Sequence, residues 1–350
     1  MDHNFTILGI ETSCDETALA IISGNLNKKP VILSELLFSQ IEEHSPFGGV
    51  VPEIAARAHA ERMPLMLQDI MQHAKMSFKD FDAIAVTSEP GLIGGVIVGL
   101  MTAKGIAVAA QKPFIGVNHL EGHALSPMLT EDISFPYLLL LVSGGHCQII
   151  IVYDYGSYEE IGTTIDDAAG EAFDKVAKML NLGFPGGPKV EQAAQKGDPL
   201  RFQLPRPLCQ TSDPNFSFSG LKTAVMRIIE KDLIKTQQDI YDLCASFQYA
   251  VSDTIENRMD IAIDIFKQRT SLSSAPCVVA GGVAANMALR HMLENLSARH
   301  NMDFFAPPLK YCTDNAVMIA YAGLVKFARK NVSSLSLKPM ARAPLGRHIS

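Results

Sequence analysis

Short apolar runs joined by polar turns appear at corresponding places in the two halves of the chain. Residues 5–10 and 18–22 are apolar and predict two strands with a polar turn between them. Residues 137–142 and 147–152 predict a second pair, joined by a turn that contains two adjacent glycines. The recurrence of strand, turn and strand indicates an internal duplication.

Apolar positions at helical spacing alternate with further short strands along the rest of the chain. The expected helices are residues 54–74, 94–110, 169–180, 221–230 and 239–268, and the further strands are residues 83–87 and 277–280. Strands mixed with helices in this order predict an α/β fold in which helices pack on sheets. We expect two lobes, residues 1–128 and 129–350, that face each other across a cleft containing the active site.

A segment rich in proline and glycine, residues 182–219, interrupts the second half and opens a helical insert that extends to about residue 270. Its proline density breaks regular structure, so the segment is either a flexible linker or an ordered loop over the cleft. Phe216 and Phe218, near its end, favour a packed loop.

Length and composition suit a protein with two cores. The chain has 350 residues, of which 47% are hydrophobic. No apolar run is judged long enough for a membrane span. The first four residues resemble neither a signal peptide nor a transit peptide. We therefore expect a cytoplasmic protein with no membrane partner.

Charge is unevenly distributed along the chain. The net charge of −7 is not that of a generic nucleic-acid binder. After Tyr321, however, no acidic residue occurs, and the basic residues are Lys326, Arg329, Lys330, Lys338, Arg342 and Arg347. Such a tail either contacts phosphates or is a solvated helix and tail, and the sequence favours neither.

Three turns have the composition of anion-binding turns. In Ser143-Gly144-Gly145-His146, adjacent glycines let backbone N–H groups approach an anion, and the serine adds a hydroxyl. Residues 281–286 form a glycine turn before a helix, which favours negative charge, and Asn286 could bond a base or ribose. Thr12-Ser13 occupies the matching turn of the first half. A plain hairpin explains one such turn, whereas three suggest a nucleotide, although no P-loop or Rossmann pattern is present.

A pair of histidines four residues apart, His119 and His123, has the helical spacing needed to share one metal ion. Glu121 lies about 200° round the helix from His119, which argues against the zinc-peptidase motif H-E-x-x-H. Asp314, before an apolar helix, is our candidate for a third ligand. A helix N-cap is the alternative role for Asp314, and a purely structural role remains open for the histidine pair.

Nine collinear segments, from about residue 7 to residue 324, resemble the bacterial TsaD proteins, formerly called Gcp. They are residues 9–17, 48–53, 90–92, 119–123, 141–146, 166–175, 185–188, 216–223 and 280–286. The resemblance implies a two-lobed actin-like, sugar-kinase-like (ASKHA) fold. It also implies transfer of a threonylcarbamoyl group from threonylcarbamoyl-adenylate to the N(6) amine of the adenosine 3′ of the anticodon, in tRNAs that read codons starting with A.

The resemblance also implies roles for individual residues. His119, His123 and Asp314 match the family's metal ligands, which hold one iron or zinc ion per chain. Asp15 and Glu16 match acidic residues with a catalytic role, in which Asp15 would orient the amine or accept its proton. The positions that match the family's donor-binding residues are Val142, Ser143, Gly144, Gly145, His146, Asp174, Gly187 and Asn286.

Other functions remain as alternatives. An ATP-dependent phosphotransferase or another carbamoyltransferase of the same fold would use similar turns, and an inactive scaffold would be expected to lose the metal residues. Bacterial family members act with an inactive paralogue (TsaB) and a small ATPase (TsaE), and we expect partners of both types besides tRNA. The chain departs from the family at Glu89, where glycine is usual.

Overall fold

The computed structural model describes residues 3–345, and within them the chain forms two compact units. The first unit comprises residues 3–132 together with Pro307–Leu345, and the second comprises Ile133–Ala306. The division expected from the sequence assigned all of residues 129–350 to the second lobe. That assignment is wrong for Pro307–Leu345, because helix α10 (Ala316–Ala328) in this stretch packs on strands of the first unit.

The first unit is built on a sheet of five strands in the order β3-β2-β1-β4-β5. β1, β2 and β3 form an antiparallel meander, whereas β4 and β5 run parallel to β1. The strands are β1 (Phe5–Glu11), β2 (Glu16–Asn25), β3 (Lys28–Ser39), β4 (Ala83–Glu89) and β5 (Phe114–Asn118). β1 ends at Glu11, directly before the polar turn of residues 12–15, and β4 ends at Ser88 and Glu89.

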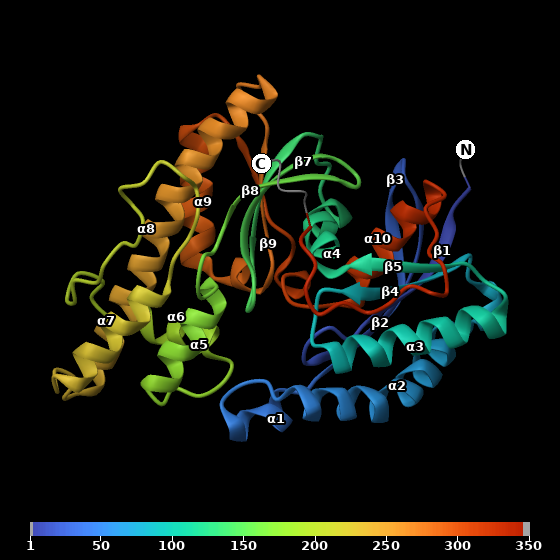
Figure 1. Ribbon diagram of the computed structural model, residues 1–350, viewed down its shortest axis with the longest axis horizontal. Coiled ribbons are helices and arrows are strands. Elements are labelled where there is room, and N and C mark those ends of the chain that lie inside the picture. The colour runs from blue at the N-terminus through green and yellow to red at the C-terminus, as the bar shows by residue number, and fades with distance from the viewer. Residues whose placement is uncertain (1–2, 346–350) are drawn as a thin grey trace. The chain divides into compact units, whose positions relative to one another are not determined.

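Helices cover both faces of this sheet (Figure 1). α2 (Pro52–Ala74) and α3 (Ile93–Ala110) lie on one face, where Leu8 and Ile10 join their buried side chains in one cluster. α10 lies on the other face, against Gly9, where a Cβ would come within 2.5 Å of the Ala316 carbonyl oxygen. The shorter elements are α1 (Ile41–His44), α4 (His119–Leu125), and the 3-10 turns η1 (Ser45–Phe47), η2 (Phe78–Asp80), η3 (Ser126–Leu129) and η5 (Leu309–Tyr311).

Helix α3 is long and apolar enough, by length and composition, to cross a membrane. This finding corrects the expectation that no apolar run reaches that length. In the described part of the chain α3 is the one helix that passes this test, and the core helix of a folded unit can pass it too. Here its buried side chains, including Val96, Leu100 and Ala103, pack towards the sheet and α2.

The second unit repeats the topology of the first. Its sheet order is β10-β9-β6-β7-β8, with an antiparallel meander β6-β7-β8, β9 parallel to β6 and β10 parallel to β9. The strands are β6 (Tyr137–Val142), β7 (Cys147–Asp154), β8 (Ser157–Thr163), β9 (Pro276–Ala280) and β10 (Asp303–Phe305). The same five-strand pattern in both units confirms the duplication and the α/β, actin-like class of fold.

The helices of the second unit include the segment rich in proline and glycine. They are α5 (Ala169–Met179), α6 (Gly186–Ala194), α7 (Ser219–Glu230), α8 (Gln237–Thr270), the 3-10 turn η4 (Gly282–Ala285) and α9 (Met287–Arg299). Part of residues 182–219 is therefore helix α6, whose first turn contains Gly186, Gly187 and Pro188. Proline is tolerated there because the first N–H groups of a helix have no partner within the helix. Phe216 and Phe218 are fully buried and stacked, so this segment is packed and is not a free linker.

Candidate metal centre and donor-binding turns

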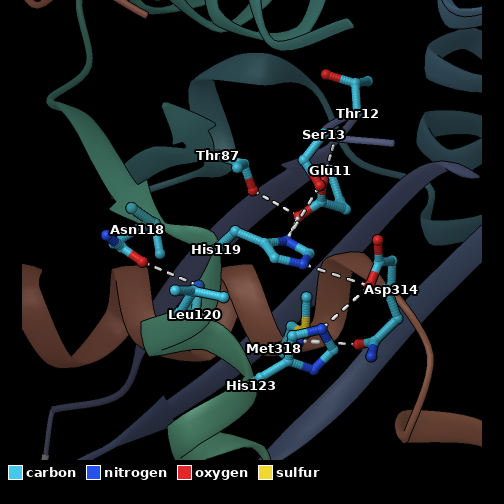
Figure 2. Close-up of polar contacts among 12 residues, drawn as sticks. Glu11, Thr12, Ser13, Thr87, Asn118, His119, Leu120, His123, Asp314 and Met318 are labelled. Carbon is cyan, nitrogen blue, oxygen red and sulfur yellow. Dashed lines mark hydrogen bonds and ion pairs between the residues drawn. The ribbon is translucent and has the colours of Figure 1, made fainter. Parts of the chain in front are cut away.

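Two histidines and one aspartate from distant parts of the chain meet in the first unit (Figure 2). His119 begins helix α4 directly after β5, and His123 follows one turn later, so the two rings lie edge to face with centroids 4.7 Å apart. The Nε2 atoms of His119 and His123 lie 3.3 and 3.0 Å from Asp314 Oδ1. One nitrogen or oxygen ligand atom from each residue lies within 4.8 Å of the others, which suits one shared ion.

Asp314 precedes helix α10 but does not cap it. The cap is Asn315, whose side-chain oxygen accepts a hydrogen bond of 3.0 Å from Met318 N. The capping alternative for Asp314 is therefore excluded, and its carboxylate faces the two imidazoles instead (Figure 2).

Glu11, which was not among the predicted site residues, completes the group. This side chain is fully buried at the end of β1, with Oε2 2.9 Å from His119 Nδ1. Thr87 Oγ1 donates to Oε2 at 2.6 Å, and Ser13 N donates to Oε1 at 2.5 Å. A glutamate that directly follows a buried apolar run was the available signal, because a buried carboxylate requires partners. Through its contact with Nδ1, Glu11 can orient His119 so that Nε2 faces the metal site.

The charged side chains of this group shift one another's pKa values. Burial lowers the pKa of His119, but the carboxylates of Asp314 and Glu11 outweigh it and raise the pKa well above the ordinary value. Burial raises the pKa of Asp314, but His119 and His123 outweigh it and hold it well below its usual range. The raised pKa of His119 favours its protonated form between these two carboxylates. A metal ion held by His119, His123 and Asp314 would also bring positive charge to the group.

Glu121 points away from this group, in agreement with its spacing. It lies within α4 between the two histidines, and its Oε2 is 2.9 Å from Lys326 Nζ. A peptidase would need this carboxylate beside the metal. The geometry therefore excludes a peptidase of the H-E-x-x-H type.

Asp15 and Glu16 lie in the turn between β1 and β2 of the same unit. The Asp15 carbonyl accepts a hydrogen bond of 3.0 Å from Gln40 N, and Glu16 begins β2. Burial and the charges of Asp314 and Asp15 raise the pKa of Glu16 well above its ordinary value, which favours its protonated form. The catalytic roles of both residues stay predictions.

In the second unit the turn between β6 and β7 is open. Ser143 N donates to the His146 carbonyl at 2.8 Å, and Ser143 Oγ accepts from His146 N at 3.2 Å. No atom lies within 4 Å of the position where a Cβ would sit on Gly144 or Gly145. A ligand can therefore approach this backbone closely.

The N-terminus of α5 contacts this turn, and hydrogen bonds connect α5 to the start of α6 and α6 to the start of α9. At α5, Glu171 N donates to the Gly144 carbonyl at 3.1 Å. At α6, Gly186 N donates to Asp174 Oδ1 at 2.7 Å, and nothing lies within 4 Å of a Cβ on Gly187. Glu191 of α6 accepts a hydrogen bond of 2.8 Å from Met287 N at the start of α9. The dipoles of these helices favour an anion here.

Gly281 packs against Val142, the last residue of β6, directly before this turn. Gly281 has φ +94°, and a Cβ there would lie 2.3 Å from the Val142 carbonyl oxygen, so only glycine fits. All eight predicted donor positions thus belong to one region of the second unit.

Two polar side chains that were predicted to bind a ligand already form hydrogen bonds within the protein. Asn286 caps α9 by accepting from Leu289 N at 3.1 Å, and its Nδ2 donates to Gln248 Oε1 at 2.8 Å. Thr12 Oγ1 donates to the Gly95 carbonyl at 2.8 Å and is fully buried. The Thr12-Ser13 turn is therefore not an open phosphate turn, and that expectation is wrong.

Comparison with known proteins assigns the chain to a family. The family model for TsaD, tRNA N6-adenosine threonylcarbamoyltransferase, matches residues 31–321. The chain belongs to the TsaD family. Curated relatives of that name include the protein of Bartonella bacilliformis, 54% identical over 97% of this chain and 95% of the relative. The protein of Brucella anthropi is 56% identical over the same shares.

Solved structures of HypF share the fold. A full-length HypF in the phosphate- and nucleotide-bound form is 13% identical, with a TM-score of 0.57 over 93% of this chain and 47% of the HypF chain. HypF of T. kodakarensis is 14% identical, with the same TM-score over 94% of this chain and 48% of the HypF chain. The chain thus spans about half the length of HypF, and the likeness supports the fold alone.

The donor set fits a metal ion of the kind expected for a TsaD protein. Two imidazoles and one carboxylate are ligands that zinc and ferrous iron both accept, with further positions left for substrate or water. The second ring nitrogen of His119 meets a buried carboxylate, which is the usual support of a metal-bound histidine. An inactive scaffold would not need this arrangement, so the geometry favours an active member.

Proposed function

We propose that this chain transfers the threonylcarbamoyl group of threonylcarbamoyl-adenylate to the N(6) amine of the adenosine 3′ of the anticodon in tRNAs that read codons starting with A. The observation that carries the proposal is the meeting of His119, His123 and Asp314, with Glu11 behind His119, in a chain of the TsaD family. The proposed ion is one iron or zinc per chain.

The donor is a mixed anhydride of a carbamic acid and a phosphate, so AMP is a good leaving group. A bound metal would act as a Lewis acid towards the donor's oxygens. The amine nitrogen attacks the carbamoyl carbon, the bond from that carbon to the phosphate oxygen breaks, and AMP leaves with the electron pair. In this proposal Asp15 accepts the proton that the amine loses.

The second unit supplies the proposed donor site. The amides of Gly144 and Gly145 and the N-termini of α5, α6 and α9 would hold the phosphate. An aromatic amine is a weak nucleophile, so holding the donor in a fixed position supplies much of the rate.

An inactive paralogue of the TsaB type is one proposed protein partner. Supporting this, α3 exposes an apolar stripe of Ile93, Ile97, Met101 and Val108, and α2, which packs against α3, exposes Leu65. A TsaE-type ATPase is the other proposed partner, on the family resemblance alone. A cytoplasmic location fits a tRNA substrate.

The test is transfer of labelled threonylcarbamoyl from purified donor to unmodified tRNA, with and without those partners. His119→Ala and Asp314→Ala should lose bound metal and activity together, whereas Glu121→Gln should keep the metal. Asp15→Asn should lower the transfer rate with metal content unchanged. A metal-free wild-type protein with full activity would overturn the metal's role, and an unaffected Asp15→Asn would remove Asp15 from the mechanism.

A further inference from the structure

The residues after α10 form an ordered segment along the edge of the first sheet. We name residues 331–342 the C-terminal strap (Figure 1). Ser333 N donates to the Phe114 carbonyl at 2.8 Å, and Gly116 N donates to Ser333 Oγ at 2.9 Å. The strap therefore covers the outer edge of β5, which is the last strand of the sheet.

The middle of the strap is anchored by a side chain. Leu337 packs against the hydrophobic cluster between the sheet and helices α2 and α3. Its carbonyl accepts a hydrogen bond of 2.5 Å from Lys104 Nζ. A Cβ on Gly116 would lie 2.2 Å from Leu337 Cδ2, so the leucine fits only over glycine. This packing anchors the backbone of the strap next to Lys338.

The end of the strap reaches the turn that supports the metal centre. Met340 N donates to the Ser88 carbonyl at 3.0 Å, and Gly91 N donates to the Ala341 carbonyl at 3.3 Å. Gly91 lies against Ser13, because a Cβ on Gly91 would be 2.7 Å from Ser13 Cβ. Ser13 Oγ is in turn 3.1 Å from His119 Nδ1.

The strap carries cations that have no carboxylate partner. Lys326, before the strap, is paired with Glu121 at 2.9 Å. Lys338 and Arg342 are exposed and form no ion pair with any residue between 3 and 345. No acidic residue follows Tyr321 in the sequence. Arg347 lies outside the described residues.

We propose that Lys338 and Arg342 bind backbone phosphates of the tRNA close to the target adenosine. The proposal rests on the proposed function, which requires a tRNA loop to reach the metal centre. Phosphates on either side of an extruded base lie within a few ångströms of it, and exposed cations on a segment that reaches the turn beside the metal centre provide the charge that they require. The rest of the chain is acidic, so these two side chains supply a local attraction that the molecule as a whole does not.

The test compares two double variants of equal charge in the full-length chain. Lys338→Glu/Arg342→Glu removes the strap cations, whereas Lys28→Glu/Lys79→Glu changes two exposed lysines at other places in the same unit. The dissociation constant for unmodified tRNA is measured at several salt concentrations. For the strap variant we expect tRNA binding weakened by about tenfold or more, and a salt slope reduced by about two, one for each lost phosphate contact. The control should match wild type in both.

Metal content and thermal unfolding of both variants check that the fold is intact. Equal tRNA affinity and equal salt slope in the two double variants would overturn the proposal, and so would a loss of affinity with an unchanged slope. Failure of the proposed function gives a different result, because the wild type would then transfer no label to tRNA.

Discussion

The imidazole of His119 is held at both ring nitrogens. Nδ1 meets Glu11 and Ser13, and Nε2 meets Asp314. A ring held in this way cannot rotate without losing contacts on both sides, so it presents one nitrogen to an ion in one orientation. The carboxylate behind it also increases the basicity of the ligand nitrogen.

Removing the charge of Glu11 should therefore weaken metal binding. We expect Glu11→Gln to lower metal affinity by roughly 10–100-fold, as for other carboxylates that support a metal-bound histidine. A competitive titration with a chelator measures this. Glu121→Gln is the matched control, because that buried glutamate belongs to α4 but is paired with Lys326. Equal affinities in the two variants would contradict the role of Glu11.

In the second unit, the carboxylate of Asp166 accepts hydrogen bonds from the residues at the start of α7. Its carboxylate accepts hydrogen bonds from Ser217 Oγ at 2.6 Å, Ser219 Oγ at 2.7 Å and Phe218 N at 2.8 Å. Burial raises the pKa of Asp166, but these hydrogen bonds outweigh it and lower the pKa below the ordinary value of 3.8.

A lowered pKa means that this stabilisation is present above about pH 4 and is lost as the pH falls through the folded-state value. We expect Asp166→Asn to reduce the free energy of unfolding by about 1 kcal/mol at pH 7, as for loss of a helix cap. The difference from wild type should shrink below pH 4. Urea denaturation at several pH values measures both. A difference that stays constant down to pH 3 would contradict this.

At this scale the sequence predicted the side chains that follow a spacing rule. His119 and His123 are separated by one helical turn, and that spacing is visible without a structure. Glu11 lies more than 100 positions before His119, and the pairing of β1 with β4 and of β4 with β5 brings it beside that ring. No local rule describes that approach.

Among the elements, α10 fixes the position of Asp314, because it follows that residue and packs on all five strands of the first unit's sheet. Small residues make this packing close. A Cβ on Gly323 would lie only 2.3 Å from Ala85 Cβ on β4. The helix therefore cannot shift towards the sheet or accept a larger residue at that point.

We expect Gly323→Ala to destabilise the first unit by about 1–3 kcal/mol, through overpacking against β4. Gly105→Ala is the control, because Gly105 is exposed within α3 and nothing lies within 4 Å of its Cβ position. That change should stabilise by about 0.5–1 kcal/mol, since alanine favours a helix. Thermal unfolding distinguishes the two, and equal effects would argue against close packing at α10.

Elements with one strong periodicity were predicted, and elements defined by tertiary contacts were not. The paired strands before and after each polar turn follow from their apolar runs. β3 was missed because Ser34 and Glu35 interrupt its apolar residues. Its exposed positions include the apolar Val31, Leu33 and Leu37, so the strand shows no regular alternation of apolar and polar residues either. α6 was missed because its first turn contains two glycines and a proline.

At the scale of the molecule, the two units divide the proposed functions. All three candidate metal ligands lie in the first unit, and all eight predicted donor positions lie in the second. A metal ion should therefore stabilise one unit selectively.

We expect metal to slow hydrogen exchange in residues 3–132 and 307–345, and to leave residues 133–306 almost unchanged. Binding stabilises the state that holds the ion, by about 2.7 kcal/mol at a metal concentration 100 times the dissociation constant. Exchange followed by mass spectrometry, with His123→Ala as control, measures the effect in each unit. Similar protection in both units would contradict it.

The return of Pro307–Leu345 to the first unit has a consequence for how the protein is made. On the ribosome, the second unit is complete in sequence before its neighbour, although its neighbour is started first. Until residues 307–345 are synthesised, the first sheet lacks α10 and leaves one apolar face uncovered. The ligand set lacks Asp314 for the same period, so all three ligands can capture a metal ion only after the whole second unit has been made.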